Sequence, residues 1–344
     1  MIVSGNMTPK ATTLQDVSRH LGLSTATVSR VMNGSSKVRP ATRARVLRAI
    51  EELGYTRNYA ARALARKQTD TLGVIFPNID SGFFSEVLKG IHEVATLYKF
   101  QLMVAFSIGT RDEPDLVSEY LLGGRVDGLI LMNLDMPEEF IRQAAQQRLP
   151  VALVDRPVGG ADVAMVSLDN VIGAQQAVSH LIEHGYQRIA VLKGPEGTFD
   201  AEQRWLGCQQ VFDRVGRTPD PRLIWEGDFH RRSGYQRMSA WLDAGRQPPD
   251  AVFALNDAMA IGVMEALRER NLGVPDDVAL VGFDDVEAAP LLGLTTVRSP
   301  MREMGRLASE AIIELLRNGR TRTRRVLATE LVVRQTCGGH RAGG

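Results

Sequence analysis

The sequence predicts a small all-α domain followed by a larger two-lobed α/β domain, in which helices cover both faces of parallel sheets. Three observations predict this arrangement. Residues 12–54 place apolar side chains at helical spacing in three short segments. From Thr71 onwards, short β-branched runs alternate with amphipathic helical stretches. Residues 1–67 hold twelve Lys/Arg against three Asp/Glu, a net charge of +9, whereas the rest of the chain carries −8.

The composition is that of a folded protein. Of the 344 residues, 44% are hydrophobic and 24% are charged, which are ordinary globular values. No apolar run is long enough for a secretory signal or a membrane span. Cys208 and Cys337 do not form a Cys-x-x-Cys pair, so we expect two reduced thiols. We therefore expect a soluble intracellular protein, whose translation starts at Met1 or Met7.

The first predicted helix begins just after residue 13. Thr13 and Asp16 have the spacing of a capping box. Residues 22–24 form a tight turn, and Ser24 is placed to cap the next helix. The apolar face of the first helix consists of Leu14, Val17 and Leu21.

The second predicted helix, from about Thr25 to Met32, is the candidate for contact with DNA. Asn33-Gly34 ends it, and Pro40 opens a third helix that Gly54 closes. The residues expected to face inward are Val28, Val31, Met32, Val46, Ile50 and Leu53. The exposed face of the second helix consists of Thr25, Ala26, Ser29 and Arg30. Short side chains let such a helix lie deep in the major groove, where an arginine can bond guanine edges or phosphates.

The alternative interpretation is a small helical cap whose basic residues are merely solvated. Three closely spaced helices, a glycine turn and a charge of +9 together favour DNA binding.

Residues 13–55, TLQDVSRHLGLSTATVSRVMNGSSKVRPATRARVLRAIEELGY, resemble the N-terminal module of the lactose-repressor/galactose-repressor family of bacterial transcriptional regulators, and the resemblance extends over nearly the whole chain. It implies a helix-turn-helix DNA-binding domain at 12–56, a hinge helix or linker at 57–69, and an effector-binding and dimerisation domain at 70–338. The last domain resembles periplasmic sugar-binding proteins. We expect its lobe 1 at about 70–166 and 296–328, and its lobe 2 at about 167–295 and 329–338.

The resemblance also implies roles for individual residues of the N-terminal domain. Thr25, Ala26 and Arg30 are expected to face base edges. The residues expected to anchor the sugar-phosphate backbone are Leu14, Ser24, Ser29, Asn33 and Val38, and Asn58 is a further expected DNA contact.

Residues 56–68 are polar and basic but rich in Ala and Leu, so they can be helical without enough apolar surface to fold alone. The resemblance implies that Tyr59–Ala65 forms a hinge helix on operator DNA, where Leu64 wedges between base pairs in the minor groove and Ala61 lines the same face. Without the resemblance, a plain linker with an ordinary helical leucine would be the preferred interpretation.

The region after Thr71 alternates strand-like and helix-like segments. The predicted strands are LGVIF (72–76), LMVAF (102–106), GLILM (128–132), VALVD (151–155), IAVLK (189–193), AVFAL (251–255) and VALVGFD (278–284). Ligands of open α/β sheets bind at the carboxyl ends of strands, and two facing lobes make a cleft there.

Polar and aromatic residues follow several of these strands. Aromatic faces stack on sugar rings, while carboxylates and arginines bond sugar hydroxyls. The expected effector-binding residues, most of which match family positions, are Asn78, Phe83, Phe84, Asp155, Arg156, Arg204, Phe229, Asn256, Asp284 and Arg298. Three arginines in one cleft would suit a sugar acid. Asp257 is interpreted as a helix N-cap, and Asp169 as either an N-cap or a ligand contact.

No nucleophile elbow, zinc-spaced histidine pair or P-loop is visible, so we expect neither an enzyme nor a cofactor or metal site. A sugar receptor outside the cytoplasm would need a signal peptide, and an architectural DNA-binding protein would leave the α/β lobes without a role. The expected partners are near-palindromic double-stranded operator DNA, a sugar or sugar acid, and a second copy of the chain. A dimer is expected because no leucine heptad follows ELVVR (330–334). The expected location is the cytoplasm, on the nucleoid, with no membrane contact, and the ligand's role as inducer or corepressor stays open.

Overall fold

The computed structural model describes residues 12–32, 34–55, 63, 66, 68–77, 82–107, 113–132, 138–147, 149–156, 158, 163–319 and 323–338. The chain divides into two compact units, Met1–Thr69 and Asp70–Gly344. Within the described residues, no helix combines the length and the apolar character that a membrane crossing requires.

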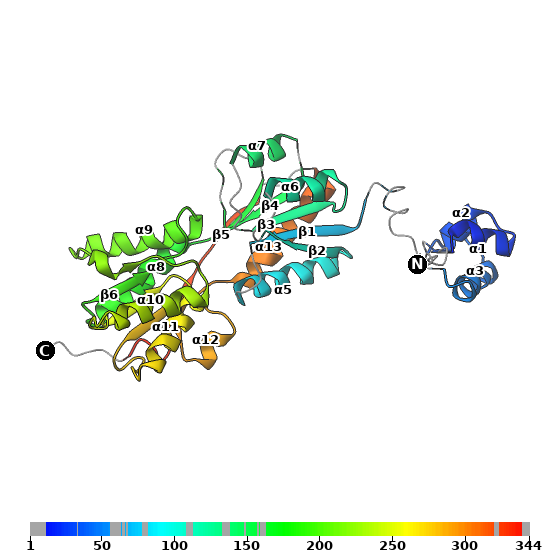
Figure 1. Cartoon of the computed structure of the whole chain (residues 1–344). Helices are drawn as coiled ribbons and strands as arrows, with labels where there is room; N and C mark the ends of the chain where they lie inside the picture. Colours follow the sequence, from blue (N-terminus) through cyan, green and yellow to red (C-terminus); the bar gives the residue numbers. More distant parts are fainter. Residues whose placement is uncertain are drawn as a thin grey trace, which may run out of the picture. The chain divides into compact units, whose positions relative to one another are not determined.

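In the first unit, described residues 12–32 and 34–55 form three helices around a small apolar core (Figure 1). Its helices are α1 (Leu14–Leu21), α2 (Thr25–Met32) and α3 (Pro40–Glu52). Val17, Val28 and Val46 are fully buried between them. Burial of these β-branched side chains from all three helices stabilises the domain, because helices this short are marginal alone.

Local capping sets the helix boundaries as the sequence predicts. The Thr13 side chain and the Asp16 side chain cap each other's backbone amides at the start of α1, which is a capping box. Gly22 ends α1 with a φ of 64°, a left-handed conformation that glycine adopts without strain. The Thr27 amide donates to Ser24 Oγ over 3.2 Å and so caps α2.

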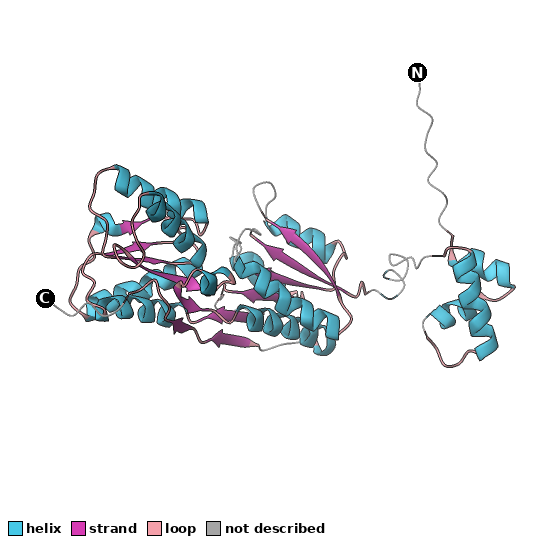
Figure 2. Cartoon of the chain, turned by 90° about the horizontal axis from the view of Figure 1, so that it is seen from below, coloured by secondary structure: helices cyan, strands magenta, loops and turns pink. Residues whose placement is uncertain are grey.

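The second unit has two sheets, which Figure 2 shows flanked by helices. The first sheet is fully parallel, in the order β11-β5-β4-β3-β1-β2. Its strands are β1 (Thr71–Phe76), β2 (Gln101–Phe106), β3 (Gly128–Met132), β4 (Val151–Val154), β5 (Ala164–Leu168) and β11 (Arg324–Leu327). The helices α5 (Gly82–Leu97) and α13 (Met301–Asn318) cover one face. The other face is covered by α6 (Glu113–Val117), the π-helical turn η1 (Ser118–Leu122) and α7 (Glu138–Gln146).

The second sheet has the order β12-β10-β9-β8-β6-β7, in which only the β10–β12 pair is antiparallel. Its strands are β6 (Ile189–Leu192), β7 (Ile224–Trp225), β8 (Ala251–Ala254), β9 (Ala279–Asp284), β10 (Thr295–Arg298) and β12 (Glu330–Val332). Helices α8 (Asn170–Glu183) and α9 (Phe199–Arg214) cover one face, and α10 (Arg231–Asp243) and α11 (Asp257–Glu269) cover the other (Figure 1). The short helix α12 (Ala288–Leu291) follows β9. We call the two sheets with their helices the first lobe and the second lobe.

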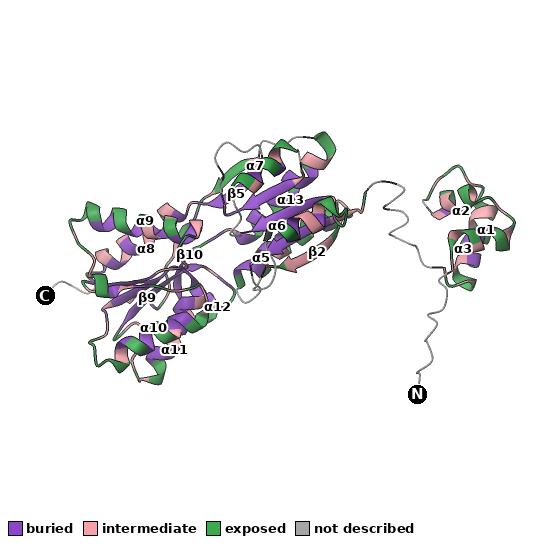
Figure 3. Ribbon diagram, turned by 45° about the horizontal axis from the view of Figure 1, so that its top comes forward, coloured by how far each residue is buried: buried purple, intermediate pink, exposed green. Residues whose placement is uncertain are grey.

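Helix packing in the first lobe depends on two glycines. A Cβ atom at Gly90 of α5 would clash with the carbonyl oxygen of Arg302, and one at Gly305 of α13 would clash with that of Val87. The two helices therefore approach backbone to backbone over this sheet face. Figure 3 shows the buried faces of the helices turned toward the sheets.

The chain crosses between the lobes three times, after β5, after β10 and after β11. The lobe boundaries that we expect at about 166 and 296 lie two residues before the ends of β5 and β10. Leu168 still pairs with Leu327 in the first sheet, and Thr296 pairs with Gly282 in the second. The sequence of an apolar strand does not show which sheet the strand joins, because its partner strands are far away in the sequence.

Candidate functional site

A cavity of ≈ 420 Å³ lies between the lobes, where the carboxyl ends of strands from both sheets meet. The first lobe contributes Phe83 and Phe84 from the start of α5. The second lobe contributes Arg204 from α9, Asn256 at the start of α11 and Asp284 at the end of β9. Small-molecule sites typically have volumes of roughly 300–1,000 Å³.

Aspartates and arginines line the cavity in equal number. Three carboxylates, three guanidinium groups and one histidine line it, namely Asp200, Asp228, Asp284, Arg204, Arg231, Arg232 and His230. Arg231 also binds both carboxylate oxygens of Glu265 on α11, at 2.9 and 2.8 Å.

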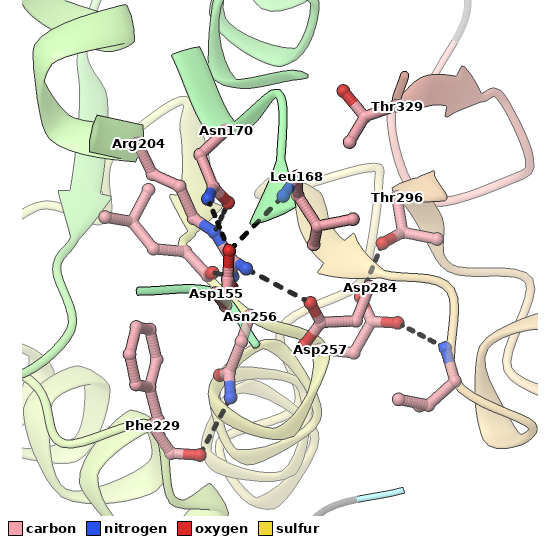
Figure 4. A network of polar contacts seen from close by, with 12 residues as sticks. Asp155, Leu168, Asn170, Arg204, Phe229, Asn256, Asp257, Asp284, Thr296 and Thr329 are labelled. Carbon is pink, nitrogen blue, oxygen red and sulfur yellow. Dashed lines mark hydrogen bonds and ion pairs between the residues drawn. The ribbon is translucent and has the colours of Figure 1, made fainter. Parts of the chain in front are cut away.

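Arg204 is the centre of a buried polar network, which Figure 4 shows from close by. Its side chain is 2% exposed. Nε donates to Asn170 Oδ1 over 2.9 Å and Nη1 donates to the Leu255 carbonyl over 2.5 Å, while Nη2 lies 3.5 Å from Asp284 Oδ1. The guanidinium also stacks on the Phe283 ring, 3.8 Å from its centroid. Two hydrogen bonds, the ion pair with Asp284 and the stacking on Phe283 hold this buried cation in one orientation.

Asp155 is not among the residues that line the cavity, and it is linked to Arg204 through Asn170. Its Oδ1 accepts hydrogen bonds from the Leu168 amide and from Asn170 Nδ2, both at 3.3 Å. Burial, together with the nearby Asp200 carboxylate, raises the pKa of Asp155 to about 7. Burial likewise raises the pKa of Asp284 well above its ordinary value, against the opposing effect of Arg204.

Several residues of this region have left-handed backbone conformations. The φ angles of Asp155, Phe229, Asp284 and Asp285 are 55°, 66°, 119° and 59°. Non-glycine residues rarely adopt positive φ, and a phenylalanine there is a clear outlier. Backbone strain of this kind is concentrated at functional sites, where the surrounding structure keeps the residues in these conformations.

Asn256 connects the cavity to the helix behind it. Its Oδ1 accepts from the Met259 amide over 2.9 Å and caps α11, and its Nδ2 donates to the Phe229 carbonyl over 2.8 Å. The amide therefore fixes the strained Phe229 backbone at the cavity wall.

The predicted N-cap role of Asp257 is wrong, because Asn256 occupies the cap and Asp257 is the first residue of the helix. Asp257 is fully buried. Its Oδ2 accepts from the Val286 amide over 2.9 Å, and its Oδ1 accepts from Thr296 Oγ1 over 2.6 Å. It thus joins α11 to the loop after β9 and to β10.

The expected convergence of three arginines is also wrong. Of Arg156, Arg204 and Arg298, only Arg204 lines the cavity. Arg298 is half exposed and pairs with Asp285 Oδ2 at 2.8 Å. β10 ends between β9 and β12, and this placement directs the arginine to a neighbour rather than to the cavity.

Asp169 is an N-cap, since its Oδ1 accepts from the Ile172 amide at the start of α8. It is not among the residues that line the cavity.

Two buried residues of the site were missed in the sequence. Asn170 follows β5 and bridges Asp155 to Arg204. Asp200 lines the cavity one helical turn before Arg204 on α9. The four-residue spacing of Asp200 and Arg204 was a detectable signal, because it places both on one helix face.

In the first unit, Thr25, Ala26 and Arg30 are exposed on α2, and Ser29 is half buried. Leu14 and Val38 pack partly against the apolar core. Leu14 is the first residue of α1, so its backbone amide is one of the donors that the helix itself does not use. A contact of this leucine with phosphate would therefore come from its backbone rather than from its side chain.

Some predicted site residues lie outside the described residues: Asn33, Asn58, Ala61, Leu64 and Asn78, together with most of the predicted hinge segment 59–65.

Comparisons with known proteins agree with this architecture. Residues 13–58 match the family described as bacterial regulatory proteins, lacI family, and residues 178–337 match the periplasmic binding protein-like domain. The chain is 34% identical over 307 residues to catabolite control protein A of Priestia megaterium, covering 88% of this chain and 92% of the relative. It is 35% identical over 335 residues to the HTH-type transcriptional regulator CelR of Thermobifida fusca, covering 94% and 98%. The chain belongs to the lacI family.

Solved structures lead to the same family. The Lac repressor dimer bound to operator and the anti-inducer ONPF matches with a TM-score of 0.83 at 29% identity, covering 96% of this chain and 100% of that chain. The complex of the transcriptional regulator CelR with cellobiose matches with a TM-score of 0.70 at 32% identity, covering 94% and 99%. The predicted family, fold class and regulatory function are therefore confirmed: this lacI-family chain is a DNA-binding transcriptional regulator.

Proposed function

We propose that this lacI-family regulator is a repressor that binds a near-palindromic operator as a homodimer and responds to a neutral sugar in the cavity between its lobes. The observation that carries the proposal is the cavity itself, in which Phe83 and Phe84 of one lobe face Arg204, Asn256 and Asp284 of the other. No catalytic activity is part of the proposal, since the curated relatives are regulators.

A sugar fits the chemistry of the lining. The rings of Phe83, Phe84 and Phe229 offer apolar faces for a pyranose or furanose ring. Carboxylate, amide and guanidinium groups opposite them can bond hydroxyls in pairs. The related regulator CelR has been solved as a complex with cellobiose, which supports a sugar here.

The equal number of aspartates and arginines in the lining favours a neutral sugar over a sugar acid. Arg204 is already neighboured by Asp284 at 3.5 Å, and Arg231 is paired with Glu265. An anionic ligand would have to compete with these carboxylates for the same guanidinium groups. A neutral ligand can instead bridge donors and acceptors without leaving a buried charge uncompensated.

Ligand contacts to both lobes provide the switch. A ligand that bonds both lobes stabilises their closed arrangement and shifts an open–closed equilibrium that exists without it. The three crossovers are the segments that absorb this movement. We propose that the closed and open arrangements differ in how well a dimer presents two copies of α2 to an operator with matching two-fold symmetry.

The test is a thermal-shift screen of the full-length chain against neutral sugars, sugar acids and purines, followed by calorimetry and operator binding with each hit. The proposal expects a neutral sugar that raises the melting temperature and changes operator affinity, the direction distinguishing inducer from corepressor. Arg298→Ala serves as the matched arginine control, because this residue lies outside the cavity. Hits confined to sugar acids would contradict the neutral ligand, and hits that bind without affecting the operator would contradict the switch.

A further inference from the structure

A second group of reactive side chains lies at the far end of α8 from the cavity. One ring nitrogen each of His180 and His184 and the Sγ of Cys337 lie within 4.8 Å of one another. Among the residues that the structure describes, this is the only group of three or more such side chains close enough to hold a metal ion. Asn170, which binds Arg204 at the cavity, is ten residues before His180, about 15 Å along the helix at 1.5 Å per residue.

The two histidines are one helical turn apart, and their ring centroids are 4.1 Å apart. His184 Nδ1 lies 2.8 Å from the His180 carbonyl oxygen. A carbonyl oxygen only accepts, so Nδ1 carries the proton and the lone pair of this ring is on Nε2. Metal-binding histidines have the same arrangement, in which one ring nitrogen donates to a carbonyl or carboxylate and the other binds the ion.

Cys337 reaches the histidines from a segment distant in the sequence. Its side chain is buried, and the chain next to it is held by Thr336, whose Oγ1 donates to the Leu280 carbonyl over 2.7 Å. Tyr186 Oη donates to the Cys337 carbonyl over 2.8 Å, and the Tyr186 ring lies nearly parallel to that of His184. The thiol and the imidazoles are therefore positioned by separate hydrogen bonds from two sides.

We propose that His180, His184 and Cys337 form a zinc site in the second lobe. Two imidazole nitrogens and one thiolate suit Zn²⁺, which binds nitrogen and sulfur ligands in tetrahedral geometry, and they do not suit Mg²⁺ or Ca²⁺, which take oxygen ligands. Zinc bonds of about 2.0–2.3 Å place neighbouring ligand atoms roughly 3.5 Å apart, so the side chains need to close by about 1 Å. A water molecule completes the set at the partly exposed His180. As the Zn–S bond forms, the Cys337 thiol releases its proton to solvent.

The site differs from the sequence-based expectation of no zinc-spaced histidine pair and no metal. His180 and His184 have the four-residue spacing of one helical turn, a signal that was missed in the sequence, and the fold brings Cys337 to this pair. Bound zinc would fasten the end of α8 to the segment that follows β12. It stabilises the second lobe because the ion binds the folded arrangement of the three ligands and not the unfolded chain.

The experiment titrates zinc chloride into untagged, metal-free, full-length protein by calorimetry, and cobalt chloride with absorbance detection of a thiolate-to-cobalt band. We expect one ion per chain, a higher melting temperature with zinc, and the charge-transfer band with cobalt. Cys337→Ser and His184→Gln should each weaken zinc affinity by at least about tenfold and remove the zinc-dependent rise in melting temperature. Cys337→Ser should also remove the cobalt band.

Two control variants change a cysteine and a histidine that lie outside the proposed site. Cys208→Ala and His92→Gln change another buried cysteine and an exposed histidine outside the group, and both should bind zinc like the wild type. His184 and Cys337 are buried, so a substitution at either can impair folding. His180 is partly exposed, and His180→Gln tests the site in that case. Absence of zinc binding to the wild type would overturn the proposal. So would equal zinc affinity in wild type, His180→Gln and Cys337→Ser.

Discussion

The guanidinium of Arg204 and the carboxylate of Asp284 lie 3.5 Å apart with only 2% and 6% of their side chains exposed. The two residues come from α9 and β9, whose sequence positions are 80 residues apart. Both line the cavity, because α9 begins and β9 ends at the same edge of the second sheet.

Removal of one side chain of this buried ion pair should lower both stability and effector affinity, because the other side chain stays buried without its partner. Arg204→Ala leaves Asp284 buried beside the raised-pKa carboxyl of Asp155, so it should abolish effector binding and lower the free energy of unfolding by about 3–5 kcal/mol. Calorimetry with the effector and urea unfolding measure the two effects.

The matched control is Arg298→Ala, which breaks a half-exposed ion pair outside the cavity. This change should lower the free energy of unfolding by less than about 1 kcal/mol and leave effector affinity unchanged. Equal losses of unfolding free energy and of effector affinity in Arg204→Ala and Arg298→Ala would contradict a role of Arg204 in effector binding.

Buried carboxyls should make stability depend on pH. Burial raises the pKa of Asp257 from 3.8 to about 7. The folded chain then holds this proton more tightly than the unfolded chain, so the contribution to stability is full below about pH 4 and is lost as pH rises to about 7. Asp257→Asn cannot ionise, and should reduce the fall in unfolding free energy by up to about 1 kcal/mol per pH unit in that window. Urea unfolding between about pH 5 and pH 8 tests this, and parallel curves for variant and wild type would refute it.

The two roles of Asn256 can be separated by substitution. Asn256→Ala removes both the helix cap and the donor to Phe229, and should cost about 1 kcal/mol of stability for the cap alone. Asn256→Asp keeps an oxygen for the Met259 amide but places no donor against the Phe229 carbonyl. Both variants should weaken effector binding, whereas Asn256→Asp should retain more of the cap. Wild-type effector affinity in Asn256→Asp would show that the Phe229 bond does not shape the cavity.

In the first unit, Arg30 is exposed on α2, and we expect this arginine to discriminate bases. Arg30→Ala should weaken binding to the preferred operator by about 1–3 kcal/mol and relax the preference at one base pair. Fluorescence anisotropy on operator and on random duplexes, at several salt concentrations, measures this. An equal loss on both duplexes would mean that Arg30 contacts phosphate alone.

Local features of the sequence predicted local structure well. The capping box of Thr13 and Asp16 and the start of α3 at Pro40 depend on residues within one turn of each other. Arg204, Phe229, Asn256 and Asp284 line one cavity as their places near the predicted strand ends led us to expect, because the carboxyl ends of parallel strands meet at one edge of a sheet. Their contact with the effector stays a prediction.

The predictions from sequence were wrong where contacts with residues distant in the sequence determine the role of a side chain. Arg298 follows a strand end as Asp284 does, but it pairs with Asp285 instead of lining the cavity. Either Asn256 or Asp257 can cap a helix that begins at this point of the sequence. In the structure β8 ends at Ala254 and α11 begins at Asp257, which leaves Asn256 as the N-cap. Asn170 resembles an ordinary first helical residue until Asp155 and Arg204 are brought to its two sides.

If sugar in the cavity controls operator binding, each of the two ligands must change the affinity for the other by the same factor. The direct measurement is the Kd for operator with and without saturating sugar, together with the Kd for the sugar with and without saturating operator. For the wild type, we expect the two Kd ratios to be equal and to differ clearly from one. A sugar that binds the cavity while both ratios stay at one would contradict it.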